Sequence, residues 1–392
     1  MTRDLPARTV LFGLFFWVLV GTSSEGLAQE RCLEFRASAD TLGHFQDPEM
    51  LESSGLVVSR KNPGVIWTHN DSGDTARLFA STVDGRALGV WTLDGTVAID
   101  WEDIGLARCE DGAMECILIA DTGNNDNNRT DLAVLRVREP SVDLAVASPV
   151  VGTLSGVEVF PFSYPDGSWD CESIMSHPLT GDVFLVSKVL SGASGLYRFP
   201  SFVAGAPVVL ERLSEQTLGN IPLVEQSTTG ADFSPDGQRF VVRTYVHLHE
   251  FAVGADGDVG AAFARESEDV RVQEEQQGEA VAYGADGQSV WTTSEGTSAP
   301  IHAYPCARFG EEVVDEPAPE GVDEQAPELV EADAPADAPA DPVAELNDAL
   351  PKTKNEASRG CCRATQVSPS GDGALAPFSL FLLLGLAVRR LG

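Results

Sequence analysis

The sequence predicts an all-β protein built as a five-bladed β-propeller, and three observations indicate this fold. A short acidic phrase recurs along the chain, and each copy opens an apolar, strand-like run. A turn and a second strand rich in Val, Ile, Phe or Trp follow each copy. Acidic residues stand at the start of nearly every repeat. Long repeats that each contain enough strands for one small sheet are typical of propeller blades.

The acidic phrase divides the chain into blades. Its copies read Glu52-Ser53-Ser54-Gly55-Leu56, Glu102-Asp103-Ile104-Gly105-Leu106, Glu172-Ser173-Ile174-Met175 and Glu279-Ala280-Val281-Ala282, with a weaker copy at Ala231-Asp232-Phe233-Ser234. In the weaker copy the acid has moved one place along the chain. Five copies predict five blades, and six is the alternative if the long second repeat contains an extra blade.

Apolar runs separated by Gly, Asn and Asp turns predict the strands within each repeat. Blade one is expected to contain strands at 55–58, 65–68, 77–80 and 88–91, and blade two at 117–120, 132–135 and 157–160 after its opening strand. Blade three is expected to use 183–186, 195–198 and 208–210, and blade four 239–242 and 248–251, with a loosely patterned outer edge. Blade five has 289–292 and 300–304 and stops one strand short.

The strand missing from blade five can come from the segment that precedes blade one. Residues Cys32-Leu33-Glu34-Phe35-Arg36 have no partner in a repeat of their own. Pairing them with the last blade closes the ring and removes an open sheet edge. A pair of β-sandwiches would also explain the strands, but it gives no reason for an acid at each repeat start.

Seven cysteines in an exported chain favour disulfides. Ring closure brings Cys32 near Cys306, so we expect these two to be bonded. Cys109 and Cys116 flank a turn between two strands and are expected to bridge it. Cys171 is expected to be a small, buried apolar residue.

Composition divides the chain into four segments. Residues 1–28 are expected to be a secretory signal peptide, with Arg3 and Arg8 before an apolar run and small residues up to Ala28. Residues 29–308 form the propeller. Residues 309–360 are expected to be a disordered stalk, because acidic residues and Ala-Pro units dominate them. Residues 361–392 contain a Cys pair, a hydrophobic segment and terminal arginines.

The formal net charge of −34 argues against nucleic acid as a partner, because phosphate contacts need basic side chains. The partners that remain are a ligand or envelope component on one face of the propeller, and the membrane through the C-terminal segment. We expect the protein to be a monomer.

Cys361-Cys362, the apolar run from Ala374 to Val388, and Arg389-Arg390 follow one another at the end of the chain. This order resembles the C-terminal sorting signals of myxobacterial surface proteins, the MYXO-CTERM type. The resemblance implies processing near the Cys pair by a membrane protease, with the protein left at the cell surface. An uncleaved tail helix held by its arginines is the alternative, and it also anchors the chain.

In a propeller blade, the start of the innermost strand and the end of the second strand lie on the same face. This geometry gathers six acids as candidate metal ligands: Glu52, Glu102, Asp103, Glu172, Asp232 and Glu279. Converging carboxylates repel one another, so a cation, a cationic ligand, protonation or water must offset the repulsion. Oxygen-only ligands favour a hard cation, with calcium as the first candidate. The alternative is a ring of glutamates in a wet channel, each bonded to backbone N–H groups of the next blade.

Four stretches of the repeat region carry a family resemblance: Ser53-Ser54-Gly55-Leu56, Trp67-Thr68-His69-Asn70-Asp71-Ser72-Gly73-Asp74, Asp100-Trp101-Glu102-Asp103-Ile104 and Asp121-Thr122-Gly123-Asn124-Asn125. They resemble a group of secreted bacterial propellers that is similar to the esterase-like phytase and SdiA-regulated families. Calcium-dependent lactonases and phosphoesterases use related propellers. The resemblance implies Glu52, Glu102, Glu172 and Glu279 as ligands, and it departs from the pattern at Ala231.

Two functions from different classes fit this sequence. The first is a non-catalytic surface module whose acidic face binds a ligand or envelope component. The second is a metal-dependent hydrolase of phosphate esters or lactones, in which calcium polarises the bound oxygen and activates water. There His69 is the candidate base, while Lys188 and Arg243 would hold an anionic substrate. The first is favoured, because all three can equally be structural and the sequence contains no Gly-x-Ser-x-Gly, His-Glu-x-x-His or P-loop pattern.

Overall fold

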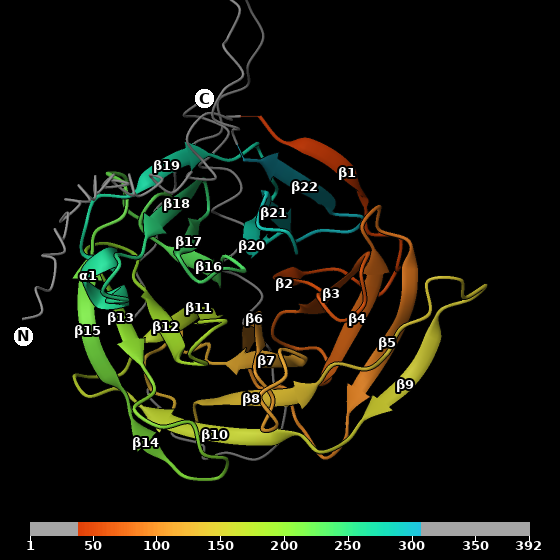
Figure 1. The fold of residues 1–392 in the computed structure, drawn as a ribbon, viewed down its shortest axis with the longest axis horizontal. Coiled ribbons are helices and arrows are strands. Elements are labelled where there is room, and N and C mark those ends of the chain that lie inside the picture. Colours follow the sequence, from red (N-terminus) through yellow and green to blue (C-terminus); the bar gives the residue numbers. More distant parts are fainter. Residues whose placement is uncertain (1–37, 307–392) are drawn as a thin grey trace, which may run out of the picture. The chain divides into compact units, whose positions relative to one another are not determined.

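The computed structural model describes residues 38–306, and in this part of the chain five sheets surround a common axis (Figure 1). Each sheet is one blade, so the predicted five-bladed propeller is confirmed. The innermost strands are β2 (Ser53–Val58), β6 (Trp101–Ala107), β11 (Asp170–Ser176), β16 (Thr228–Phe233) and β20 (Gly278–Tyr283). The second strands are β3 (Val65–Asn70), β7 (Cys116–Asp121), β12 (Val183–Lys188), β17 (Arg239–Thr244) and β21 (Ser289–Ser294).

The outer strands complete each blade by antiparallel pairing. The third strands are β4 (Arg77–Thr82), β8 (Ala133–Arg138), β13 (Ser194–Arg198), β18 (His247–Ala252) and β22 (Pro300–Pro305). The fourth strands are β5 (Ala87–Leu93), β10 (Glu158–Ser163), β15 (Glu211–Gln216), β19 (Glu268–Arg271) and β1 (Asp40–His44). A five-residue helix, α1 (Val259–Phe263), lies beside β15 and β18. Between residues 38 and 306, no helix has the length and apolar character needed to cross a membrane.

Burial follows position within the blade. Residues of the inner strands β2, β3, β7 and β12 are buried along their whole length, because neighbouring blades cover both sheet faces. The outer strand β15 is exposed or half-buried throughout. This difference explains why continuous apolar runs mark the inner strands in the sequence. Trp67, Trp91 and Trp101 pack in the core shared by blades one and two.

The ring closes through a strand from the N-terminal side of blade one, as predicted. The closing strand is β1, which pairs antiparallel with β22 from Asp40 opposite Ala303 to His44 opposite Pro300. The expected segment, 32–36, is therefore not the one at this edge, and it lies outside the described residues. The apolar pattern failed here because β1 reads Asp-Thr-Leu-Gly-His and is largely exposed.

The long second repeat contains no extra blade. Its surplus residues form β9 (Val150–Leu154), which adds to blade one in parallel with β5. The predicted strand at 208–210 was assigned to the wrong blade, because β14 (Val208–Val209) pairs in parallel with β10 of blade two. The fourth strand of blade three is β15. Its sequence is polar, so a prediction based on apolar runs did not identify it.

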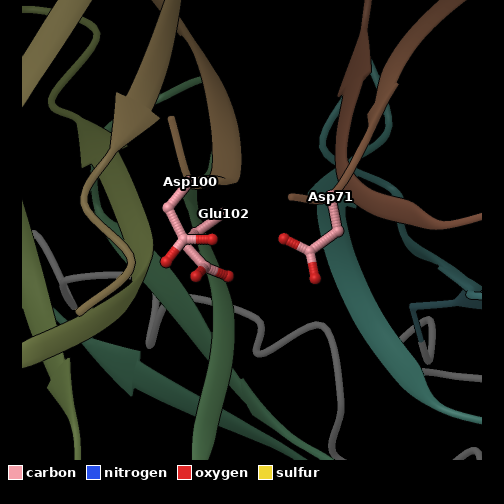
Figure 2. Close-up of side chains that lie close together, drawn as sticks. All are labelled: Asp71, Asp100 and Glu102. Atoms are coloured by element: carbon pink, nitrogen blue, oxygen red, sulfur yellow. The ribbon is translucent and has the colours of Figure 1, made fainter. Parts of the chain in front are cut away.

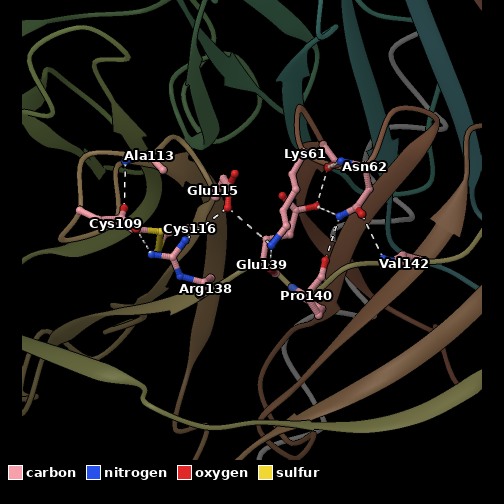
Figure 3. A network of polar contacts seen from close by, with 12 residues as sticks. Lys61, Asn62, Cys109, Ala113, Glu115, Cys116, Arg138, Glu139, Pro140 and Val142 are labelled. Atoms are coloured by element: carbon pink, nitrogen blue, oxygen red, sulfur yellow. Dashed lines mark hydrogen bonds and ion pairs between the residues drawn. A yellow bond between two sulfur atoms is a disulfide. The ribbon is translucent and has the colours of Figure 1, made fainter.

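The end of the propeller where the innermost strands finish is held by polar contacts (Figure 3). Glu139 accepts hydrogen bonds at Oε1 from Asn62 Nδ2 at 2.7 Å and Trp67 Nε1 at 2.8 Å, and also from the Ser59 hydroxyl. These bonds join blades one and two. The nearby Cys109–Cys116 disulfide, predicted from the turn between these residues, is confirmed.

The other cysteines of the described part agree with expectation where they can be followed. Cys171 is a free, fully buried thiol. Cys306 is disulfide-bonded. Its expected partner, Cys32, lies outside the described residues, as do the signal peptide, the stalk and the C-terminal segment.

Candidate metal centre

Every innermost strand carries a register shift at the same level of the propeller. The residues at the shift are Ser54 in β2, Glu102 in β6, Glu172 and Ser173 in β11, Thr229 in β16 and Glu279 in β20. Such a β-bulge re-aims the side chain of the extra residue. Three of the five blades place a glutamate at this position, on the end of the axis opposite the Glu139 contacts.

The structure corrects the alignment of the sequence repeat. Blade one presents Ser54 where blade two presents Glu102, and the Ser54 hydroxyl donates to the Glu102 carbonyl. Glu52 lies just before β2 and forms an isolated bridge with Glu295. Blade four presents Thr229 at the bulge, rather than Asp232. Aligning the repeat copies by their Glu and Gly residues gave the wrong correspondence between blades. A bulge changes the strand register without changing the sequence spacing.

Three carboxylates converge at this end of the axis, and we call them the carboxylate triad: Asp71, Asp100 and Glu102. One oxygen from each lies within 4.8 Å of the others. Asp100 and Glu102 lie together before and at the bulge of β6, and Asp71, which follows β3, points toward them (Figure 2). Sequence reasoning had selected Glu102 as a ligand and had missed Asp71 and Asp100. Both stood in the stretches that carried the family resemblance.

Gly123 makes room for the triad. A Cβ at this position would overlap Glu102 Oε1 and Asp100 Oδ2. The backbone N–H groups of Thr122 and Gly123 both donate to the Asp100 carbonyl, at 3.1 and 3.2 Å. The loop after β7 therefore holds its backbone against the two carboxylates, and only glycine fits there without moving them.

Four more acids surround the triad and interact with it electrostatically: Glu52, Glu172, Glu279 and Glu295. Together with the triad they form what we call the carboxylate cluster. Burial, with repulsion from Glu279, Asp100 and Glu52, raises the pKa of Asp71 to about 8. Burial also raises the pKa of Asp100 to about 6.

Burial and neighbouring acids act in the same direction on the rest of the cluster. Burial and then repulsion from Glu172 and Asp71 raise the pKa of Glu102 well above its usual range. Burial raises the pKa values of Glu279 and Glu295 to about 8, and further repulsion comes from Glu295 on Glu279 and from Asp71 and Glu52 on Glu295. Without a cation, ionising these groups together is costly.

Several buried oxygens of the cluster have no hydrogen-bond donor. These are Asp71 Oδ1, Glu172 Oε2 and Glu279 Oε2. Glu172 and Glu279 are 5% and 4% exposed, so bulk solvent reaches little of their surface. Buried polar atoms are normally paired, and orphaned ones indicate a missing water or ion. An oxygen-only donor set with unpaired lone pairs fits a hard cation.

Lys188 lies among the carboxylates of this cluster, while Arg129, which pairs with Asp121 and Asp131, acts on Asp100 and lowers its pKa against the effect of burial. The Lys188 Nζ donates to Glu172 and, at 3.0 Å, to the hydroxyl of Tyr245. Burial alone would lower the pKa of Lys188, but Glu172, Tyr245, Glu279 and Glu102 together raise it well above its usual range. These two cations are fewer than the seven carboxylates, so the acids can ionise together only if further positive charge is bound.

Asp103 and Asp232, also predicted as ligands, make a different set of contacts. Asp103 Oδ2 accepts from Ile174 N at 2.9 Å and Ala231 N at 3.2 Å, and Oδ1 accepts from Ile104 N at 2.8 Å. Asp103 therefore ties blade two to blades three and four. Asp232 Oδ2 accepts from Tyr283 N of blade five at 2.8 Å. These bonds match the alternative in which axial acids serve the backbone of other blades.

The side chains of the remaining candidates, His69 and Arg243, contact other protein groups and not the carboxylate cluster. His69 is fully buried, donates from Nδ1 to the Asn70 carbonyl at 2.8 Å and packs its ring edge-on against Trp101. Burial lowers its pKa to about 4, so the ring is neutral. Arg243 pairs with Glu275 and donates to the carbonyls of Ala280 and Thr293, at 2.7 and 3.0 Å. Of the three catalytic candidates, only Lys188 contacts the cluster.

No protein-family model and no curated protein matches this chain. Solved structures with a related fold include a gluconolactonase, XC5397, from Xanthomonas campestris, at 11% identity and a TM-score of 0.35, over 62% of this chain and 69% of that chain. A putative 6-phosphogluconolactonase from Bacteroides uniformis matches at 12% identity and a TM-score of 0.34, over 68% and 78%. U3-55K matches at 12% identity and a TM-score of 0.36, over 69% and 98%. At these scores the likeness carries no functional inference, so the class rests on the chain itself: a five-bladed propeller with a partly buried carboxylate cluster at one end of its axis.

Proposed function

We propose that this protein is an exported, surface-anchored propeller that binds a hard divalent cation, with calcium as the first candidate. The face that carries the carboxylate cluster would also bind a ligand or envelope component. The observation that carries the proposal is the convergence of Asp71, Asp100 and Glu102 within 4.8 Å of one another. The unpaired buried oxygens of Glu172 and Glu279 support it. Asp71, Asp100 and Glu102 would hold the ion.

Calcium suits this site better than zinc or copper does. It takes six to eight oxygen ligands in flexible geometry, whereas zinc and copper favour nitrogen and sulfur donors. No His or Cys belongs to the triad. A bound cation would supply the positive charge that the cluster lacks, and its remaining coordination positions are where an oxygen of a ligand would bind.

Export and anchoring rest on the sequence of both ends of the chain. The signal-peptide pattern supports export, and the Cys-hydrophobic-Arg order supports attachment to the surface. The Cys109–Cys116 disulfide supports an oxidising compartment.

A metal-dependent hydrolase of phosphate esters or lactones is the second candidate. One observation favours it: the Lys188 ammonium, with Tyr245 at 3.0 Å, stands among the carboxylates that surround the triad. Lys188 would orient an anionic oxygen of the substrate beside the ion.

Calcium-dependent thermal unfolding tests the first proposal. We expect calcium at a concentration 100-fold above its Kd to stabilise the protein by about 2.7 kcal/mol, which raises the unfolding midpoint by several degrees. Glu102→Gln should abolish this rise, because it removes one ligand charge. Glu215→Gln, an exposed change on β15, should leave it intact. A midpoint that no divalent ion moves would contradict the proposal.

The hydrolase candidate needs a separate measurement. A panel of phosphate esters and lactones should be turned over by the calcium-loaded protein, and both Glu102→Gln and Lys188→Met should remove the turnover. Calcium stabilisation without turnover would leave the binding function standing and reject the hydrolase.

A further inference from the structure

A pocket of about 340 Å³ opens between blades two and three, at the opposite end of the strands from the carboxylate cluster. Its wall is formed by the turn after β6, the turn between β11 and β12, and a loop of blade three. The lining side chains with a bearing on its chemistry are Ala107, Arg108, Glu110, Arg136, Val183 and Phe202. Glu110 is exposed and forms no ion pair with Arg108. Pockets of this size accommodate small organic molecules.

Arg108 brings a positive charge to this pocket that no carboxylate neutralises within residues 38–306. Its Nε donates to the Pro178 carbonyl at 3.0 Å, and its Nη1 to the Gly112 carbonyl at 2.8 Å. Nη2 meets no acceptor among the described residues. Two neighbouring arginines differ: Arg136 pairs with Glu158 through two bonds, and Arg138 pairs with Asp111 and Glu115. In a chain as acidic as this one, an uncompensated guanidinium beside a pocket is a feature that an anion would satisfy.

Phe202 contributes an aromatic ring to the other side of the pocket, and the buried Phe160 lies behind it. The Arg136 guanidinium carbon lies 5.6 Å from the centre of the Phe202 ring and 5.1 Å from that of Phe160. The two phenylalanine rings stack at 3.7 Å with only 5° between their planes. A planar ligand can lie against such a surface and gain cation–π attraction from Arg136.

The pocket wall is held in place by covalent and hydrogen bonds. The Cys109–Cys116 disulfide closes the turn that carries Gly112, and Cys109 N donates to the Ala113 carbonyl at 2.8 Å (Figure 3). Arg108 ties this turn to the turn at Pro178 in blade three. A preformed pocket avoids the entropy loss of ordering its walls when a ligand binds.

We propose that this pocket binds a small aromatic carboxylate. The carboxylate would accept charge-assisted hydrogen bonds from Arg108 Nη2, and the ring would lie against Arg136 and Phe202. Arg108 Nε and Nη1 already donate to carbonyls, so Nη2 is the nitrogen that remains for the ligand, and one carboxylate oxygen can accept from it. The apolar side chains of Ala107 and Val183 would contact the ring. This site does not depend on the cation proposed for the other end of the propeller.

A ligand-observed NMR titration of the full chain with benzoate tests the proposal. A ligand of this size is expected to bind with a Kd on the order of 1 mM. Arg108→Gln should weaken binding about tenfold or more, because it removes the charge-assisted bond. The matched control Arg138→Gln, at the end of β8 and outside the pocket lining, should change it less than twofold.

A second variant covers the structural role of Arg108, which also joins two turns. Phe202→Leu leaves that link intact and should weaken benzoate binding several-fold while leaving acetate binding unchanged. Three results would overturn the proposal: no benzoate binding, equal binding by wild type and Arg108→Gln, or tighter binding of inorganic phosphate than of benzoate.

Discussion

Glu102 and Asp103 are neighbours in β6, yet their carboxylates have opposite surroundings. Asp103 is fully buried and accepts three backbone N–H groups, from Ile104, Ile174 and Ala231. The bulge places the Glu102 side chain near Asp71, Asp100 and Glu172. Both pKa values are raised, by burial first. They differ in what accompanies burial: donors lower the pKa of Asp103, whereas other acids raise that of Glu102 further.

The comparison separates acids that hold the propeller together from acids that require a partner. A buried carboxylate with donors on both oxygens contributes to stability, and its removal orphans the donors. A buried carboxylate surrounded by other carboxylates destabilises the fold unless a proton or cation is bound. Asp103 therefore has a structural role, and we assign cation binding to the acids at and near the bulge, such as Glu102.

Replacing Asp103 should produce the largest effect. Asp103→Ala leaves three buried N–H groups without an acceptor, and each such group costs about 1–3 kcal/mol. We expect the free energy of unfolding, measured with denaturant in the absence of divalent ions, to fall by about 3–9 kcal/mol.

The control for Asp103→Ala is its neighbour. Glu102→Ala should leave stability without divalent ions unchanged or slightly raised, because it removes repulsion. Equal losses for the two variants would end the distinction between the two residues.

The pH dependence of the cation-free protein should be the next largest effect. Folding raises the pKa of Asp100 to about 6 and those of Asp71, Glu279 and Glu295 to about 8, so the folded state binds more protons than the unfolded state. The contribution of these groups to the free energy of unfolding is therefore fully present below the ordinary carboxyl pKa. It is lost as the pH rises through about 6 to 8.

We expect a loss of at least about 2 kcal/mol between pH 5.5 and pH 8.5, because each unit of pKa shift corresponds to about 1.4 kcal/mol. Thermal unfolding in a chelator measures it, and saturating calcium should reduce the decline. Stability that rises over this range without divalent ions would contradict the account.

Gly123→Ala should have the smallest effect on folding while still impairing the cation site. The added methyl group would displace Glu102 and Asp100, whose flexible ends can move apart at little cost. We expect calcium affinity to fall about tenfold, or 1.4 kcal/mol, with a smaller change in the midpoint of the cation-free protein. Unchanged calcium affinity, measured by titration calorimetry, would show that the triad is not the site.

The sequence predicted the inner part of each blade better than the outer part. Strands such as β7 and β12 are buried on both faces, so their apolar runs identify them. The strands β1 and β15 lie at blade edges, are polar and exposed, and are defined only by their neighbours. Packing between distant segments therefore decided the closing strand and the fourth strand of blade three.

The candidate site was predicted in part, and for a physical reason. Acids at repeat starts indicated one face of the propeller, and the structure brings Glu102, Glu172 and Glu279 into electrostatic interaction there. The bulges moved Ser54 and Thr229 into the positions expected for Glu52 and Asp232, because a bulge depends on the pairing of two strands. Asp71 and Asp100 joined the triad through loop geometry that spacing alone does not encode.

Titration calorimetry of the cation-free protein with calcium tests the central claim most directly. The account predicts saturable binding at the carboxylate triad that disappears in Glu102→Gln and persists in Glu215→Gln. Absence of calcium binding, or binding of equal strength in Glu102→Gln, would contradict it.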